Sequence, residues 1–150
     1  MTREAIQPDG VPVPAPPYSP VVATGDLVFT AGQVAMDRAG AIVAGGVAEQ
    51  TEQVLHNLAA CLSAAGCSMD DVVKTTVFLA DLDDFPRFNE IYAGHFTRPY
   101  PARTTVQASL APGDVVAFGI SHPCAAFDRR RVLFELDDDD RVVGAIATLF

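Results

Sequence analysis

Lysine is almost absent from this chain, and its absence removes several kinds of chemistry. The one lysine among the 150 residues is Lys74, which lies within an apolar, strand-like run. Schiff-base catalysis and the phosphate-binding lysine of a nucleotide-binding loop therefore have almost no candidate.

Basic residues are scarce in general. The chain carries 10 Lys and Arg residues against 19 Asp and Glu residues, a formal net charge of −9. Proteins that bind nucleic acid gain affinity by neutralising phosphates with Lys and Arg, and anionic membrane surfaces attract the same side chains. The composition therefore predicts a partner that is neither a nucleic acid nor a membrane.

Cysteine is also scarce, and its spacing fits neither a disulfide framework nor a zinc site. The cysteines are Cys61, Cys67 and Cys124, which form no Cys-x-x-Cys pair, and the three histidines show no metal-binding spacing. The first residues lack the apolar segment of a secretory signal. We therefore expect a cytoplasmic protein without a metal site.

Long hydrophobic runs are missing although the chain is apolar. Hydrophobic residues make up 49% of the sequence and the mean hydropathy is +0.23. No run approaches the roughly 18–20 apolar residues that a membrane span needs. The length suits one domain with its own core, and the apolar surplus predicts an interface between subunits.

Periodic patterns predict an α+β fold. Residues 8–20 are rich in proline and should form an extended arm. Apolar residues recur at helical spacing over 47–65, ending at Gly66, and over 85–96, with Asp83 and Asp84 as candidate N-caps. Strands are predicted over 27–33, 72–79, 103–110 and 115–121, with a turn or hairpin at 37–46.

The strand predicted over 103–110 alternates, and residues 111–114 should turn the chain into a partner strand over 115–121. Thr104 and Val106 share one face, whereas Arg103 and Thr105 share the other. We expect the face of Val106 to meet the helices and the face of Arg103 to border a polar pocket. After Pro123 the sequence predicts a strand, an acidic turn at 137–140 and a second strand.

Five linked motifs together resemble the RidA family of reactive-intermediate deaminases. They are Pro17-Tyr-Ser19, Phe29-Thr-Ala-Gly-Gln33, Asp71-Val-Val-Lys-Thr-Thr-Val-Phe-Leu79, Phe88-Asn-Glu-Ile-Tyr92 and Pro101-Ala-Arg-Thr-Thr-Val106. The resemblance covers about residues 15–122 of a single domain, with a proline-rich arm at 1–14 and an extra strand-turn-strand segment at 123–150.

The resemblance implies a chorismate-mutase-like fold, in which two helices pack on one face of a mixed sheet. It also implies a homotrimer with sites in the clefts between subunits. Members with a complete site hydrolyse enamines and imines that bear a carboxylate to keto acids and ammonia, without metal or organic cofactor. The expected partner is therefore a small carboxylate-bearing substrate.

The resemblance also gives roles to particular residues. Arg103 matches the carboxylate-binding arginine, and Tyr18 matches a tyrosine that closes the site from a neighbouring chain. Asn89 and Gly32 match ligand-binding positions, and Thr105 lies beside Arg103. Judged by residue type alone, Arg103 is better explained as an exposed arginine at a strand end, and only the motif around it favours the binding role. Asn89 is equally well explained as a surface polar residue or a local hydrogen-bonding residue at a helix end.

Two departures from the family pattern weaken the expected chemistry. Gly119 stands where the family carries its catalytic glutamate, and Ala31 stands where a serine is common. Neither residue can transfer a proton, and general acid–base help is typically worth about 10²–10⁴-fold. The sequence therefore predicts either an atypical deaminase with a roomier pocket lined by Ala31 and Gly119, or a non-catalytic trimer that binds small acids or a partner.

Overall fold

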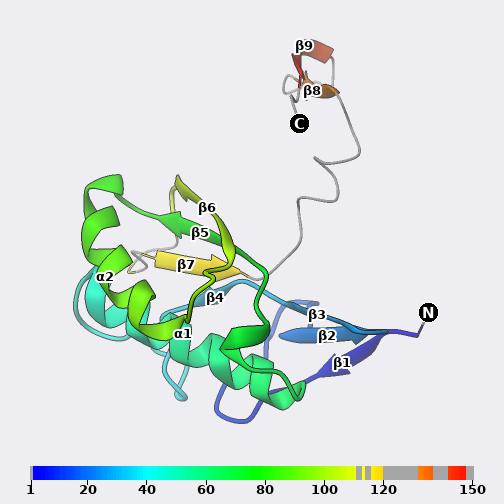
Figure 1. The fold of residues 1–150 in the computed structure, drawn as a ribbon, viewed down its shortest axis with the longest axis vertical. Coiled ribbons are helices and arrows are strands. Elements are labelled where there is room, and N and C mark those ends of the chain that lie inside the picture. Colours follow the sequence, from blue (N-terminus) through cyan, green and yellow to red (C-terminus); the bar gives the residue numbers. More distant parts are fainter. Residues whose placement is uncertain (1, 111–112, 114–115, 120–131, 137–141, 148–150) are drawn as a thin grey trace.

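The computed structural model describes residues 2–110, 113, 116–119, 132–136 and 142–147, with only the backbone described at 117–119 and beyond (Figure 1). Helix α1 spans Val47–Ala64 and helix α2 spans Phe85–His95, with short 3₁₀ helices η1 (Met69–Asp71) and η2 (Leu82–Asp84) before β5 and α2. Strands form small sheets beside these helices, so the predicted α+β class is confirmed.

The amino-terminal sheet contains two strands that the sequence reading missed. Its order is β1 (Glu4–Ile6), β2 (Val21–Thr24) and β3 (Leu27–Thr30), and both pairings are antiparallel. Between β1 and β2 the proline-rich stretch forms neither helix nor strand, because proline lacks the N–H that either structure would use.

The second sheet has the order β4 (Gln33–Val34), β7 (Val116–Gly119), β5 (Lys74–Leu79) and β6 (Ala102–Gln107). Strand β6 runs parallel to β5, whereas β7 pairs antiparallel with both β4 and β5. The prediction that 103–110 and 115–121 are partner strands is therefore wrong, since β5 lies between them. The turn expected at 37–46 is present, closed by a bridge between Met36 and Ile42.

Helix α1 begins and ends where its sequence signals lie. The Glu49 carboxylate accepts a hydrogen bond of 2.9 Å from the Gly46 N–H, which satisfies one of the free N–H groups of the first turn. The helix ends before Gly66, whose φ of +75° is the left-handed conformation that glycine adopts at little cost. The Cys67 N–H then donates to the Leu62 carbonyl oxygen over 2.9 Å.

Helix α2 begins at the predicted place but is capped differently. Pro86 lies in its first turn, where the missing N–H does no harm. Asp84 occupies the N-cap position, yet its side chain makes no capping hydrogen bond. Instead the Asp81 carboxylate accepts from the Asp83 N–H over 2.9 Å and caps the preceding helix η2.

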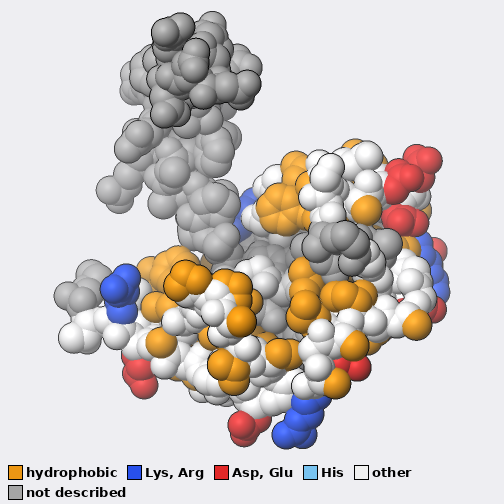
Figure 2. All heavy atoms as spheres, turned by 180° about the vertical axis from the view of Figure 1, so that it is seen from behind, with side chains coloured by type: hydrophobic (Ala, Val, Ile, Leu, Met, Phe, Trp, Pro, Cys, Tyr) orange, Lys and Arg blue, Asp and Glu red, His pale blue; other side chains and the backbone are white. Residues whose placement is uncertain are grey.

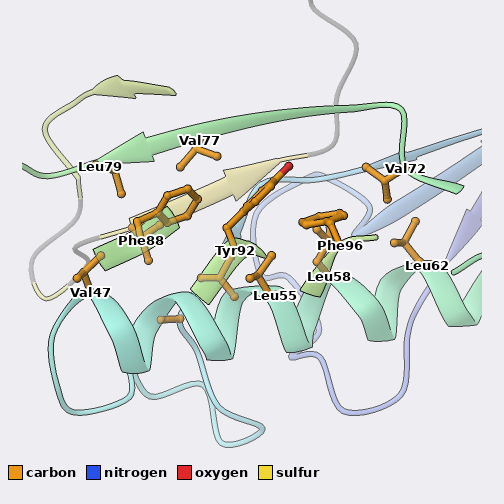
Figure 3. Close-up of a cluster of buried hydrophobic side chains, with 13 residues drawn as sticks. Val47, Leu55, Leu58, Leu62, Val72, Val77, Leu79, Phe88, Tyr92 and Phe96 are labelled. Carbon is orange, nitrogen blue, oxygen red and sulfur yellow. The ribbon is translucent and has the colours of Figure 1, made fainter. Parts of the chain in front are cut away.

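The main core lies between the two helices and one face of the second sheet (Figure 3). Strand β5 alternates, so that Val77 and Leu79 are fully buried whereas Phe78 is exposed. The helices complete the cluster with buried aliphatic and aromatic side chains: Val54, Leu55, Leu58 and Leu62 from α1, and Phe88 and Tyr92 from α2.

The alternation predicted for β6 is present, but the assignment of its faces is wrong. In the register of β5 and β6, Arg103 pairs with the buried Thr75, so both side chains face the helices. Val106 pairs with Phe78, and both are exposed on the opposite face. The helix-facing side therefore holds the arginine, and the apolar pair lies on the open face.

The last two strands, β8 (Val132–Leu136) and β9 (Val142–Ala147), pair antiparallel in a sheet of their own. The register shifts between Glu135 and Leu136, as it does at a β-bulge. The acidic turn predicted at 137–140 lies outside the described residues.

Candidate functional site

A cleft of about 320 Å³ opens where helix α2 meets the start of strand β6. One wall comes from α2, and the other comes from the residues just before β6 and at its start. The lining residues are Asn89, Tyr92, Ala93, Tyr100, Pro101 and Arg103.

Arg103 lies against a set of aromatic rings, all carried by α2. Its guanidinium carbon, Cζ, is 4.6 Å from the ring centre of Tyr92, 5.2 Å from that of Phe85 and 5.4 Å from that of Phe88. All three distances lie within the roughly 6 Å over which a cation is attracted to an aromatic face. This attraction explains how an arginine can face the helix side of the sheet.

No carboxylate of the described residues neutralises Arg103. The ion pairs among those residues join Arg87 to Glu90 and His95 to Glu52, and none includes Arg103. A guanidinium carries five N–H donors in a planar fork that matches a carboxylate. The structure therefore presents a cation at a cleft, and no acidic side chain in the described part of the chain is paired to it.

Tyr92 connects this cleft to the core. Its hydroxyl lies 3.2 Å from the Thr75 hydroxyl, and the two form a buried hydrogen bond. Burial raises the pKa of Tyr92, and the Thr75 hydrogen bond and the positive charge of Arg103 only partly oppose that shift. Tyr92 therefore keeps its proton near neutral pH and is a hydrogen-bonding group rather than a base.

The sequence places Tyr92 in the apolar helical spacing over 85–96, but it does not reveal the position of this residue beside Arg103. The signal was the spacing of Phe85, Phe88 and Tyr92, which puts three rings on one helix face. That face could be matched to Arg103 only once the pairing of β5 with β6 was known.

Two other predicted residues lie near Arg103. Asn89 lines the same cleft, one turn before Ala93 on α2. Thr105 follows Arg103 on the same face of β6, in register with Val77. Its Oγ1 atom is buried and has no hydrogen-bond partner within the described part of the chain.

Tyr18 and Gly32 line a different cleft of about 360 Å³, between the proline-rich arm and β4. Tyr18 is 53% exposed. Apart from Gly32 and its two chain neighbours, no described residue has an atom within 4 Å of a Cβ built on Gly32, so open space lies there. Within one chain the structure therefore does not bring Tyr18 or Gly32 to Arg103.

Ala31 and Gly119 also lie apart from the Arg103 cleft within one chain. Ala31 is held before β4, where its N–H donates to the Pro20 carbonyl oxygen over 2.8 Å. Gly119 of β7 is in register with Thr76 of β5, whereas Arg103 of β6 is in register with Thr75, the preceding residue of β5. Each such set of residues in register forms one row across the sheet. Since adjacent rows face opposite sides of a sheet, the Gly119 row faces away from Arg103.

Among the residues that the structure describes, the lining of the cleft offers no side chain suited to proton transfer near neutral pH. Its lining residues include no Asp, Glu or His. The predicted strand over 115–121 contains no acidic residue in the sequence either, so this lack does not depend on placing the family glutamate at Gly119.

In the described ranges, no three His, Cys, Asp or Glu side chains gather as metal ligands, and no helix is long and apolar enough to cross a membrane.

Comparison with known proteins places this chain in a family. Residues 10–121 match the family model described as endoribonuclease L-PSP. A human protein named 2-iminobutanoate/2-iminopropanoate deaminase is 42% identical over 113 residues, covering 75% of this chain and 82% of its own length.

Solved structures agree with that match. The crystal structure of RidA from an Antarctic Psychrobacter is 39% identical, with a TM-score of 0.73, and the match covers 77% of this chain and 95% of that one. The crystal structure of Escherichia coli TdcF with bound serine is 35% identical, with a TM-score of 0.71 and coverages of 77% and 94%. This chain therefore belongs to the RidA family, whose matching model carries the name endoribonuclease L-PSP.

Proposed function

We propose that this protein hydrolyses a small imine or enamine that bears a carboxylate, giving a keto acid and ammonia. The observation that carries the proposal is Arg103, a cation at a cleft with no acidic partner among the described residues. The 42% identity to a human protein named as an imine deaminase supports the reaction type.

The chemistry needs few protein groups beyond an anchor for the substrate. An enamine first takes a proton on carbon and becomes the imine. The oxygen of a water molecule then bonds to the imine carbon while the π electrons move to nitrogen. In the tetrahedral adduct formed from the protonated imine, one proton passes from the water oxygen to nitrogen by way of solvent. The carbon–nitrogen bond then breaks and its electron pair leaves on ammonia, while the oxygen releases its second proton to solvent as the carbonyl of the keto acid forms.

Arg103 would hold the carboxylate of the substrate through two parallel N–H···O hydrogen bonds. Such a clamp fixes the imine carbon beside it and removes the entropy of a free encounter. Asn89, on the same cleft, offers an amide that can donate to or accept from the substrate.

The proposal includes a homotrimer of chorismate-mutase-like subunits in the cytoplasm. Exposed apolar side chains on the open face of the second sheet favour association, because Phe78 is 37% exposed and Val106 39% exposed. Figure 2 shows hydrophobic side chains over much of one side of the molecule. In a trimer, the exposed Tyr18 of one subunit would close the Arg103 cleft of its neighbour.

Water activation would differ from the usual family route. Because the described residues bring no carboxylate to the cleft, the rate of the hydrolytic step should be lower by about 10²–10⁴-fold than with a positioned general base. Turnover can persist because a protonated imine is already electrophilic. If Ala31 and Gly119 enlarge the pocket, they must do so across the subunit boundary, since neither lines the Arg103 cleft of its own chain.

One observation favours a second function, that of a trimer that binds small acids or a protein partner without turnover. The described lining of the cleft holds a cation and an amide but no acidic side chain and no histidine.

A ribonuclease activity is disfavoured, although the family model carries that name, because a net charge of −9 opposes binding of RNA phosphates.

Ammonia release from imino acids generated in situ separates the two functions. We expect release above the uncatalysed rate with small imino acids, and its loss in Arg103→Ala. Aromatic imino acids, tested in parallel, report whether the pocket admits a bulkier acid. Binding of the keto acid product without any ammonia release would instead establish the second function. Release that Arg103→Ala leaves unchanged would contradict the proposed role of Arg103.

A further inference from the structure

We infer that the rings of Phe85, Phe88 and Tyr92 form an aromatic shelf that positions the Arg103 guanidinium for carboxylate binding. The inference rests on the proposed function and concerns the same cleft. It makes these rings positioning residues, which act on the substrate through Arg103.

The shelf comes from a single helix face. Its three rings are spaced by three and then four residues along α2, so they lie on one side of the helix. The Arg103 Cζ atom lies over each ring, at 4.6–5.4 Å from its centre. The guanidinium is therefore attracted by several ring faces at once.

The shelf and a bound carboxylate would use different parts of the guanidinium. An aromatic ring attracts the cation through its negative face, whereas a carboxylate accepts hydrogen bonds in the plane of the N–H groups. Contact with the rings therefore does not consume the donors that hold the substrate. It restricts the directions in which the long arginine side chain can point, so less rotamer freedom is lost when the ligand binds.

The shelf is itself held in place by the core. Phe88 is fully buried and Tyr92 is 5% exposed. The hydrogen bond between Tyr92 and Thr75 joins α2 to the β5 residue that pairs with Arg103. The rings and the strand that carries the arginine are thus fixed relative to each other before any ligand arrives.

Phe85 is the best position for a test, because it contributes a ring to the shelf and is only partly buried. In Phe85→Leu, affinity for 2-oxobutanoate, measured by isothermal titration, should fall about two- to five-fold, as expected for one lost cation–π contact at a partly exposed site. The KM for imine hydrolysis should rise by the same factor while kcat changes less. Phe85→Tyr, which keeps a ring, should restore both values.

Two controls separate positioning from a general loss of structure. Phe29→Leu makes the same change at another partly buried position, in β3, and should leave affinity unchanged. In an Arg103→Ala background, Phe85→Leu should have no further effect on the remaining affinity. Thermal unfolding of each variant verifies that it is folded.

The outcomes also separate this inference from the proposed function. Weaker binding in Phe85→Leu without ammonia release from the wild type would support the shelf and overturn the deaminase proposal. Ammonia release with an unchanged affinity in Phe85→Leu would overturn the shelf and leave the deaminase proposal standing. An equal effect of Phe85→Leu with and without Arg103 would also overturn the shelf.

Discussion

The hydroxyls of Tyr92 and Thr75 lie 3.2 Å apart and form a buried hydrogen bond between helix α2 and strand β5. Thr75 is also the residue of β5 that pairs with Arg103 on β6. One side-chain contact thus connects the helix that carries the aromatic shelf with the strands that carry the cation.

Removing either hydroxyl should destabilise the protein. Tyr92→Phe and Thr75→Val each leave a buried hydroxyl without this partner, which typically costs about 1–3 kcal/mol. Urea unfolding should show this loss for each single variant. The double variant should lose less than the sum of the two, because no orphaned hydroxyl remains, so strictly additive losses would contradict a direct interaction.

Replacing Arg103 by lysine should weaken acid binding although the charge is kept. Lysine cannot form two parallel hydrogen bonds, and a hydrogen bond to a charged group is worth about 1.5–3 kcal/mol. We therefore expect affinity for 2-oxobutanoate to fall by about tenfold or more in Arg103→Lys, measured by isothermal titration.

Arg98→Lys is the matched control for that measurement. Arg98 also lies over a ring, 5.0 Å from the centre of Tyr100, but it does not line the cleft. Its replacement should leave affinity within about twofold, below the loss of a single charged hydrogen bond. Equal losses in the two variants would show that general positive charge, and not the planar fork, holds the acid.

Alkaline pH should destabilise the protein through Cys61. Burial raises the pKa of the Cys61 thiol from 9.0 to about 11. The folded state holds this proton more tightly than the unfolded state does. The contribution of the Cys61 thiol to the free energy of unfolding is therefore fully present below pH 9 and is lost as the pH rises toward 11. Urea unfolding at several pH values should therefore show stability falling over this range.

The fall in the free energy of unfolding with pH should be less steep in Cys61→Ala, which has no thiol to titrate at that position. Cys67→Ala, a change at a half-buried cysteine, should leave the contribution of Cys61 to the slope in place. An unchanged slope in Cys61→Ala would assign the alkaline loss to other groups. Tyr92 acts in the same direction, since burial also raises its pKa.

A charge on the open sheet face should disrupt the assembly. Val106 and Phe78 are direct partners across β5 and β6 and form an exposed apolar pair. If this face is the subunit interface, Val106→Asp would bury an unpaired carboxylate there. We expect light scattering to show a trimer for the wild type and a monomer for Val106→Asp.

Leu82→Asp supplies the comparison, because Leu82 is an exposed apolar residue in η2 and not on that sheet. It should remain trimeric. If Val106→Asp remains a trimer, the subunit interface does not lie on this sheet face. If the wild type is a monomer, the proposed trimer is wrong.

The helices could be predicted from the sequence because their signals are local. The apolar spacing from Val47 and the glycine at position 66 place α1 to within a residue of its observed end. The pairing of strands was not accessible in the same way. Strand β6 joins β5 rather than β7, and such pairing depends on contacts between residues far apart in the chain.

The position of Arg103 shows why the sheet faces were assigned wrongly. A face with Val106 was expected to meet the helices because valine is apolar, but aromatic rings on α2 receive the arginine instead. Motif resemblance identified Arg103 and Asn89, which do share a cleft. The placement of Tyr18 relative to that cleft stays a prediction, since it concerns a second copy of the chain.

The parallel pairing of β5 with β6 has a wider consequence. Parallel strands need a crossover, and here the crossover contains α2, so Thr75, the aromatic shelf and Arg103 all belong to one uninterrupted β-α-β segment. The proposed anion anchor is thereby encoded by a single stretch of the gene. Strand β7 lies outside that stretch, so substitutions in β7 leave every residue of this β-α-β segment unchanged.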